Sequence, residues 1–250
     1  MIKPSSRTAR FRLGATALAA LTLFGTAACG ATAHDTAPRA ATVAAADQIR
    51  PGVVERDDLR AVFDAAGVHG SFALLDVKTR STTVVDRRLA ETPLVPASSF
   101  KVPHALVALE TGVVKSPDEV IPWDGTPQPF PEWEHDMTMR EAVRISNAAA
   151  FQVIARRVGL QREGQWLHRL GYGNRRTGTV VDRFWLDGPL KISAVEQTRF
   201  LERLAAERLP ASRANQRTVR DIYLSRDPRA FGGTTATGES GIYVVDASKP

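Results

Sequence analysis

Apolar residues in the middle of the chain follow first the spacing of β-strands and then the spacing of helices. Residues 72–77 and 82–85 are short apolar, β-branched runs separated by four polar residues, a pattern that is typical of a β-hairpin. Residues 57–66, shortly before them, suit a short helix. We therefore expect the folded domain to begin near Val53.

The pattern becomes helical over residues 98–110. Pro103 fits such a helix only within the first turn, where the missing N–H of proline leaves no hydrogen bond unmade. Ser98 is therefore predicted at the helix N-terminus. Capping patterns and apolar spacing predict three further helices: one that starts at Asp136 or Thr138, one over residues 151–158 that ends at Gly159, and one that starts at Ser193.

A final strand is predicted over residues 241–246, close to the end of the chain. A hairpin followed by several helices and a strand favours an α+β domain over alternating βαβ units. We expect an α/β sandwich in which an antiparallel sheet is flanked by helices, together with a helical subdomain.

The composition is that of a globular protein: 43% of the 250 residues are apolar and 24% are charged. The formal net charge is +6, but the first 28 residues contain four basic residues and no acidic one. The remainder carries about +2 and has no basic stripe with interleaved aromatic residues, which argues against nucleic acid as a partner.

The first 28 residues (1–28) are predicted to be a secretory signal peptide, with a basic start and an apolar stretch that is short for a membrane span. Small residues precede Cys29, as at the cleavage site of bacterial lipoproteins. We expect an exported protein, lipid-anchored through Cys29 at the outer face of the bacterial cell membrane; secretion with an unmodified Cys29 is the alternative. Residues 29–52, rich in Ala, Thr and Pro, are predicted to be a flexible tether before the domain of residues 53–250.

The main candidate for chemistry is a serine and a lysine three residues apart, Ser98 and Lys101. Residues i and i+3 of a helix share a face, so the hydroxyl and the amine can point into one site. A serine is a weak nucleophile that needs a positioned base. Because this spacing also arises by chance in long chains, its interpretation depends on the residues around it.

Four blocks support a catalytic interpretation: residues 96–103 with the pair itself, residues 146–148 with Ser146, residues 170–174 with the sequence Tyr-Gly-Asn, and residues 184–193 with Trp185. In this order and at this spacing they resemble class D (oxacillinase-type) serine β-lactamases and the related penicillin-binding proteins. The resemblance runs from about residue 53 to the end of the chain and implies the β-lactamase/transpeptidase-like fold.

The resemblance also implies a role for each matched residue. Ser98 would attack the β-lactam carbonyl and form an acyl-enzyme, with Lys101 as general base and with the Ser98 N–H in an oxyanion hole. Lys101 would be carboxylated by CO₂ on Nζ (N6-carboxylysine), because burial disfavours the ammonium form and only the neutral amine attacks CO₂. Ser146 would relay a proton to the lactam nitrogen. Trp185 would donate its indole N–H to the carboxylated lysine.

A wider set of residues would line the substrate site, and no cofactor besides CO₂ is implied. Alternatively, Trp185 is a core aromatic residue, Ser146 a solvated helix residue and the Tyr-Gly-Asn element a turn. The spacing of His104, His135 and His168 does not resemble a metal site, so we expect these histidines to be structural or exposed. The substrate-binding residues implied by the resemblance are Trp185, Leu186, Tyr172, Thr237, Gly238 and Glu239, and Leu186 and Phe151 would wall the lysine pocket.

Departures from the family pattern count against efficient turnover. Ala236 stands where the family has the lysine of Lys-Thr-Gly, and that lysine would make a charge-assisted contact with the substrate worth about 1.5–3 kcal/mol. The backbone N–H of Glu239 can still complete the oxyanion hole. The chain ends sooner than family members, so we expect an incomplete C-terminal part with an uncovered sheet edge. Ala148, smaller than the usual valine, is expected to loosen the lysine pocket.

The leading hypothesis is a serine β-lactamase that hydrolyses β-lactam antibiotics, an activity that gives antibiotic resistance. One alternative is a penicillin-binding or sensor-like protein that is acylated without efficient turnover. Others are an inactive truncated homologue and a D-Ala-D-Ala transpeptidase or carboxypeptidase acting on peptidoglycan stem peptides. The expected partners are β-lactam small molecules, with a membrane contact only through the lipid anchor.

Overall fold

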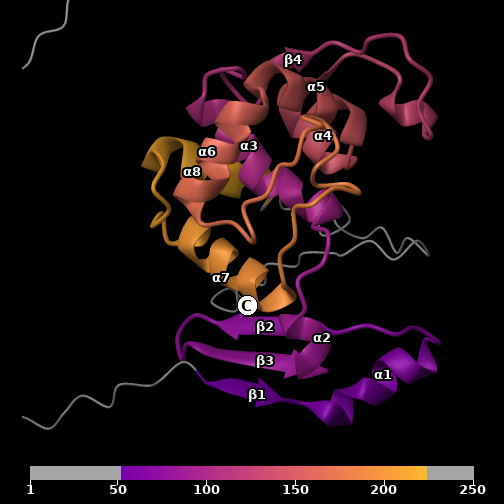
Figure 1. Ribbon diagram of the computed structural model, residues 1–250, viewed down its shortest axis with the longest axis vertical. Helices are drawn as coiled ribbons and strands as arrows, with labels where there is room; N and C mark the ends of the chain where they lie inside the picture. The colour runs from indigo at the N-terminus through magenta and orange to yellow at the C-terminus, as the bar shows by residue number, and fades with distance from the viewer. Residues whose placement is uncertain (1–51, 224–250) are drawn as a thin grey trace, which may run out of the picture. The chain divides into compact units, whose positions relative to one another are not determined.

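The computed structural model of the protein describes residues 52–223, which are coloured in Figure 1. The predicted signal peptide, Cys29 and almost all of the predicted tether lie outside the described residues. So do the predicted strand over residues 241–246 and the block with Ala236, Thr237, Gly238 and Glu239. The statements that follow concern residues 52–223.

The main sheet has three strands in the order β1-β3-β2: β1 (Val53–Glu55), β2 (Phe72–Asp76) and β3 (Ser81–Val85). The predicted hairpin is confirmed, because β2 and β3 are antiparallel. Its turn is closed by the Asp76 carboxylate, which accepts from the backbone N–H groups of Lys78 and Thr79. These bonds lower the pKa of Asp76. Strand β1 pairs in parallel with β3 and was not predicted.

Eight α-helices and a small second sheet complete the described chain. The second sheet pairs β4 (Val120–Ile121) with β5 (Met137–Thr138), and 3₁₀ turns cover Asp57–Leu59, Ala97–Phe100 and Pro131–Trp133. The helices are α1 (Arg60–Ala65), α2 (Arg87–Glu91), α3 (Lys101–Glu110), α4 (Met139–Arg144), α5 (Ala148–Val158), α6 (Leu160–Leu170), α7 (Ala194–Ala205) and α8 (Arg213–Tyr223).

Capping side chains set the starts of the three helices α4, α5 and α7, each of which the sequence predicts. At α7 both bonds of the predicted capping box form between Ser193 and Glu196. At α4 the Thr138 hydroxyl accepts from the backbone N–H of Glu141. Helix α5 starts three residues earlier than predicted, because the side chain of Asn147 caps it by accepting from the backbone N–H of Ala150.

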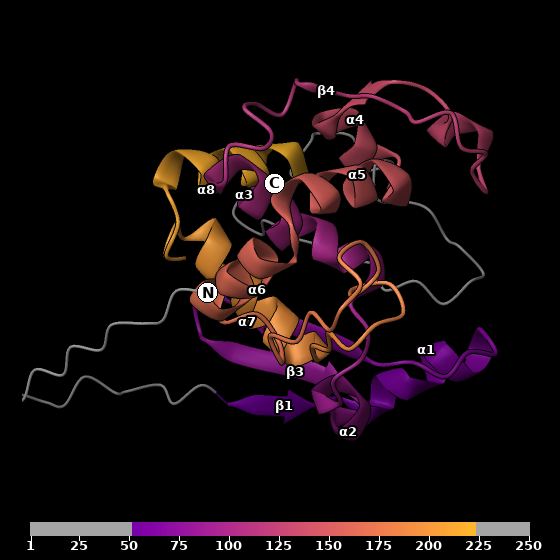
Figure 2. The same ribbon diagram turned by 45° about the horizontal axis from the view of Figure 1, so that its top comes forward.

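The predicted helix over residues 98–110 is a 3₁₀ turn followed by α3, with Ser98 in the 3₁₀ turn. Every residue of α3 from Lys101 to Leu109 is buried. The helix packs against α5 and α8, and it lies among the other helices in both views (Figures 1 and 2). Lys101, the predicted general base, therefore lies on the most deeply buried helix of the described chain.

The sheet is joined to the helices by α7, which packs against β2, α2 and α8. Val84 of β3, Ala90 of α2 and Val195 of α7 form a small apolar cluster there, separate from the main core. The architecture of a sheet covered by helices, beside a helical subdomain, is the predicted α+β class. Within residues 52–223 no helix is both long and apolar enough to cross a bilayer.

Candidate active site

The turn before α3 exposes a serine hydroxyl at the edge of the core. Ala97 has a φ of 46°, in the left-handed region that residues with a Cβ rarely occupy. Its backbone N–H donates to the carbonyl of Trp185 at 2.9 Å, and the Ser99 hydroxyl donates to the carbonyl of Pro96 at 2.6 Å. These bonds leave Ser98, between them, partly exposed.

Lys101 begins α3 and is 2% exposed. Its Nζ lies 2.8 Å from Oγ of Ser98 and 3.1 Å from Oγ of Ser146. The two hydroxyls are 3.0 Å apart, with Ser146 donating to Ser98. The structure thus brings together the three residues that were predicted to be catalytic. The lysine is buried, whereas both serines are partly exposed.

Ser146 reaches this position through an unusual helix end. The N–H of Asn147 donates to the carbonyl of Ala142 at 2.8 Å, and the N–H of Ser146 donates to that of Val143 at 3.1 Å. This is the Schellman pattern, in which the residue with left-handed backbone is usually glycine. Here it is Ser146, with a φ of 55°. A strained non-glycine residue costs about 1–3 kcal/mol and is found mainly at functional sites.

Aromatic side chains form the wall behind the lysine. The ring centroid of Phe151 lies 6.0 Å from Nζ of Lys101. Trp185 is fully buried against Phe100, with ring centroids 5.5 Å apart. Its indole Nε1 is buried without a hydrogen-bond partner among the described residues, which is costly for an N–H donor. Leu186, half-buried, packs at the edge of the same core.

The Tyr-Gly-Asn element forms a structural turn. Tyr172 is fully buried and its hydroxyl donates to Gln197 at 2.8 Å, and burial raises the pKa of this phenol. The Asn174 side chain donates to the carbonyl of Pro189 and accepts from the N–H of Lys191. The element therefore ties the end of α6 to the segment after Trp185, and a contact between Tyr172 and substrate stays a prediction.

The histidines differ from one another in burial. His135 and His168 are exposed, whereas His104 is fully buried with Nε2 2.9 Å from Oε1 of the buried Glu163. The prediction did not include Glu163. The sequence does carry a signal for it, since Glu163 precedes Leu167 and Leu170 on the buried face of α6. Within residues 52–223, no three Asp, Glu, His or Cys side chains lie close enough together to hold a metal ion.

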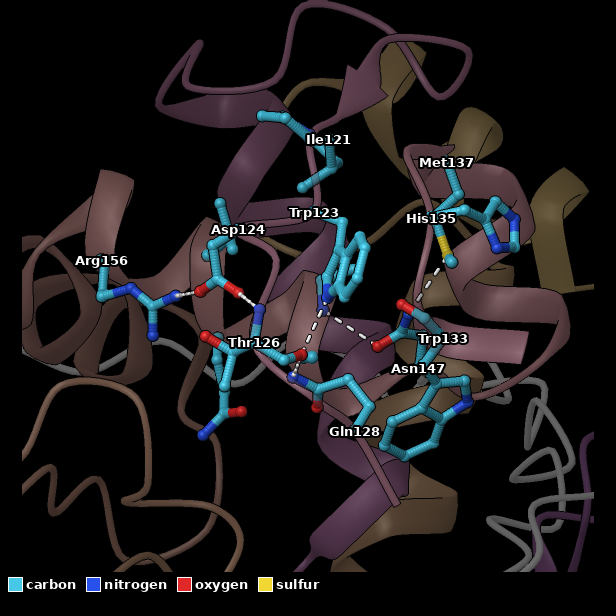
Figure 3. Close-up of a pocket in the computed structure, with 15 residues that line it drawn as sticks. Ile121, Trp123, Asp124, Thr126, Gln128, Trp133, His135, Met137, Asn147 and Arg156 are labelled. Carbon is cyan, nitrogen blue, oxygen red and sulfur yellow. Dashed lines mark hydrogen bonds and ion pairs between the residues drawn. The ribbon is translucent and has the colours of Figure 1, made fainter. Parts of the chain in front are cut away.

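A pocket of about 170 Å³ lies beyond Asn147. Trp123 and Trp133 flank it, and the ion pair between Asp124 and Arg156 stands at one side (Figure 3). Asn147, which directly follows Ser146, lines this pocket and lies within 3.2 Å of Sδ of Met137. No sequence pattern predicts this pocket, because its walls come from a long loop and from α5.

Comparison with known proteins identifies the family. Residues 70–229 match the penicillin binding protein transpeptidase domain. A β-lactamase of Pseudomonas aeruginosa, OXA-5, is 41% identical over 180 residues, which are 72% of this chain and 67% of the relative. The chain belongs to the class D serine β-lactamase branch of this family.

A solved structure agrees with this class D assignment. That of FUS-1 (OXA-85), a class D β-lactamase from Fusobacterium nucleatum subsp. polymorphum, has a TM-score of 0.65 and 37% identity, covering 67% of this chain and 70% of that one. A further relative, the regulatory protein BlaR1 of Bacillus licheniformis, is 31% identical over 197 residues, which are 78% of this chain and 32% of that protein. The likeness to FUS-1, together with that to OXA-5, confirms the predicted family.

Proposed function

We propose that the protein is a class D serine β-lactamase that hydrolyses β-lactam antibiotics through an acyl-enzyme on Ser98. The observation that carries the proposal is the mutual contact of Ser98, Lys101 and Ser146 within 3.1 Å of one another. A hydroxyl beside a buried lysine amine is an activated nucleophile. Four relatives named as β-lactamases, which are 36–41% identical to this chain, support the same activity.

The reaction follows from this geometry. The base at Lys101 takes the proton of Ser98, whose Oγ then forms a bond to the lactam carbonyl carbon. The N–H of Ser98 stabilises the negative oxygen of the tetrahedral intermediate. As the lactam C–N bond breaks, Ser146 gives its proton to the leaving nitrogen and takes the proton of Ser98 from the base at Lys101, 3.1 Å away. The base is then free to accept a second proton. In the second half, a water molecule loses a proton to this base and attacks the acyl carbon, and the base returns that proton to Ser98, which leaves as the free hydroxyl.

The buried indole N–H of Trp185 supports carboxylation of Lys101. A donor without a protein partner, in the aromatic wall of the lysine pocket, fits a negatively charged acceptor on that lysine. A carbamate formed there from CO₂ would supply an anionic base. Trp185 and Ser146 are the residues that would bind it.

Hydrolysis of nitrocefin by the purified full chain tests the proposal, with bicarbonate added to the buffer. We expect turnover by the wild-type protein and none by Ser98→Ala, with unchanged circular dichroism. Lys101→Met, which keeps the length of the side chain and removes the base, is expected to remove turnover as well. A folded wild-type protein without turnover at high protein concentration contradicts the proposal.

A second candidate is a binding protein that is acylated without efficient turnover. The likeness to the regulatory protein BlaR1 and the small Ala148 beside Ser146 favour it. A fluorescent penicillin followed by mass spectrometry over hours separates the two candidates: the adduct is lost from a β-lactamase and persists on a binder. Adding a D-Ala-D-Ala peptide in the same assay reports whether peptidoglycan stem peptides compete.

We also propose that the chain is exported and anchored through a lipid on Cys29, on the strength of the apolar stretch and the small residues before it. The test is the fractionation of bacteria that express the wild-type chain or Cys29→Ser. The wild-type protein is expected in the membrane fraction and the variant in the soluble fraction. Equal distribution of the two contradicts lipidation.

A further inference from the structure

Two buried titratable residues beside the site have no part in the reaction described above. Among the Asp, Glu, His, Lys and Arg residues of the described chain, three are no more than 2% exposed: Lys101, His104 and Glu163. A buried carboxylate or imidazolium is strongly destabilising unless it is paired. Retaining such a pair next to the lysine base therefore requires a reason beyond packing.

His104 and Glu163 form a closed pair. Nε2 of His104 lies 2.9 Å from Oε1 of Glu163, and both side chains are fully buried. The two atoms are in close contact without meeting the geometry of an aligned hydrogen bond. The other polar atoms, His104 Nδ1 and Glu163 Oε2, have no hydrogen-bond partner among residues 52–223. The pair thus connects α3 to α6. Among the described residues, neither side chain has another hydrogen-bond partner.

The imidazole of His104 packs against the aromatic wall of the lysine pocket. Its ring centroid lies 5.1 Å from that of Trp185, in an edge-to-face arrangement, and 5.5 Å from that of Phe151. It also lies 5.1 Å from the ring of Phe100. His104 is one helical turn after Lys101 on α3, so the same ring supports both aromatic neighbours from behind the lysine.

We propose that His104 and Glu163 are a positioning pair for the lysine base. Glu163 holds the imidazole of His104 in one orientation, and that imidazole holds the indole of Trp185 and the ring of Phe151 against Lys101. The inference rests on the proposed role of Lys101 as base. Neither His104 nor Glu163 touches the reacting atoms, so both act through the aromatic rings.

Apolar replacement of the pair separates positioning from stability. His104→Leu and Glu163→Leu each leave one polar partner buried alone and should lower the melting temperature. The double variant His104→Phe/Glu163→Leu leaves neither polar partner of the pair behind and should recover that temperature, as buried polar pairs replaced by apolar residues often do. Gln216→Met is the matched control, because Gln216 is fully buried in α8 and its side chain bonds only to the backbone of residues 209 and 211.

We expect kcat for nitrocefin to fall about tenfold in the double variant, with KM changed by less than about twofold, since positioning the base affects the chemical steps and not binding. The ¹³C signal of a lysine carbamate in ¹³C-bicarbonate should weaken in parallel. Gln216→Met should lose stability and keep kcat. A double variant that recovers the melting temperature together with the wild-type kcat and carbamate signal overturns the proposal.

Two further measurements keep the test decisive. If the leucine variants do not fold, Glu163→Gln keeps the size of the side chain and removes its charge; kcat should fall at least about threefold, and an unchanged kcat contradicts the pair's role. If the wild-type protein does not turn over, the proposed hydrolysis has failed. The rate at which a fluorescent penicillin acylates Ser98 then replaces kcat in the same comparison, with the same expected losses.

Discussion

The backbone N–H of Ala97 donates to the carbonyl of Trp185 at 2.9 Å, which ties the residue before the nucleophile to a buried tryptophan that packs against Phe100 and His104. The two residues are 88 positions apart in the sequence. Because this bond is made by the backbone, it survives substitution of the indole. The chemistry of the Trp185 side chain can therefore be tested without losing the turn that presents Ser98.

Trp185→Phe is expected to uncouple acylation from turnover. Phenylalanine keeps an aromatic ring against Phe100 and His104 and removes a buried N–H that has no partner among the described residues. The variant should fold with a melting temperature close to that of the wild type and react with a fluorescent penicillin. Its adduct should be hydrolysed at least about tenfold more slowly. Adduct lifetimes measured by mass spectrometry decide, and a lifetime equal to that of the wild type contradicts the role of the indole N–H.

Ser146→Gly is expected to be more stable than Ser146→Ala, although both variants should lose activity. Glycine adopts a φ of 55° without strain, so the variant should be more stable than Ser146→Ala by about 1 kcal/mol. Both variants lose the hydroxyl that contacts Lys101 and Ser98, and both should lose about 100-fold or more in kcat/KM. Urea unfolding and nitrocefin kinetics on the two variants measure the two effects. Equal stability of the glycine and alanine variants means that position 146 is not strained.

Gly173→Ala tests the structural role of the Tyr-Gly-Asn turn. A Cβ at Gly173 would lie 2.1 Å from the carbonyl oxygen of Lys191, at a φ of 49°. The backbone must move to relieve this clash, and we expect a loss of roughly 2–4 kcal/mol in unfolding free energy. Gly171→Ala is the control, because Gly171 has a similar φ of 61° but its Cβ would meet nothing closer than 4.0 Å. The control should lose only about 1 kcal/mol. Similar losses in both variants would falsify the clash as the cause.

The buried tyrosines predict a loss of stability in alkaline solution. Burial raises the pKa of Tyr172, and likewise that of Tyr223, above the value of about 10 that a tyrosine has in the unfolded chain. The stabilisation is complete below this pH and declines as the pH rises above it, because the unfolded chain then releases protons that the folded chain retains.

The dependence on Tyr172 can be isolated by substitution. Above about pH 10, Tyr172→Phe should lose stability less steeply than the wild type, by up to about 1.4 kcal/mol per pH unit. Urea midpoints at about pH 9 and pH 11 measure the two slopes, and all other titrating groups cancel in the comparison. Parallel slopes would show that Tyr172 does not contribute. The hydrogen bond that the variant loses to Gln197 shifts both midpoints equally and leaves the slope untouched.

Local patterns predicted much of the fold. The hairpin of β2 and β3, the capping box at Ser193 and the helix after Ser98 are each encoded by neighbouring residues. Strand β1 was missed because three residues carry too little periodicity to be recognised. Helix α6 is not predicted because a glycine such as Gly159 normally ends a helical region. Here Gly159, with a φ of 83°, ends α5 and directly precedes α6.

The site was predictable where a short motif encodes it and hidden where distant residues meet. Ser98 and Lys101 lie on one turn, so their contact follows from helical spacing. The left-handed backbone of Ser146 was not predictable, since that conformation normally belongs to glycine. The pair of His104 and Glu163 depends on how α6 packs against α3, which no local pattern records.

The three groups of the site come from two distant segments of the chain, because Lys101 and Ser146 are 45 positions apart in the sequence. The strained turn at Ser146 connects α4 to α5 and depends on the packing of these two helices. A chain in which α4 and α5 have separated therefore has no proton relay beside its nucleophile. Covalent labelling by a penicillin therefore counts natively assembled molecules. A short pulse of labelled penicillin would measure the fraction of molecules with an assembled site. It would also detect separation of α4 from α5 before the chain as a whole unfolds.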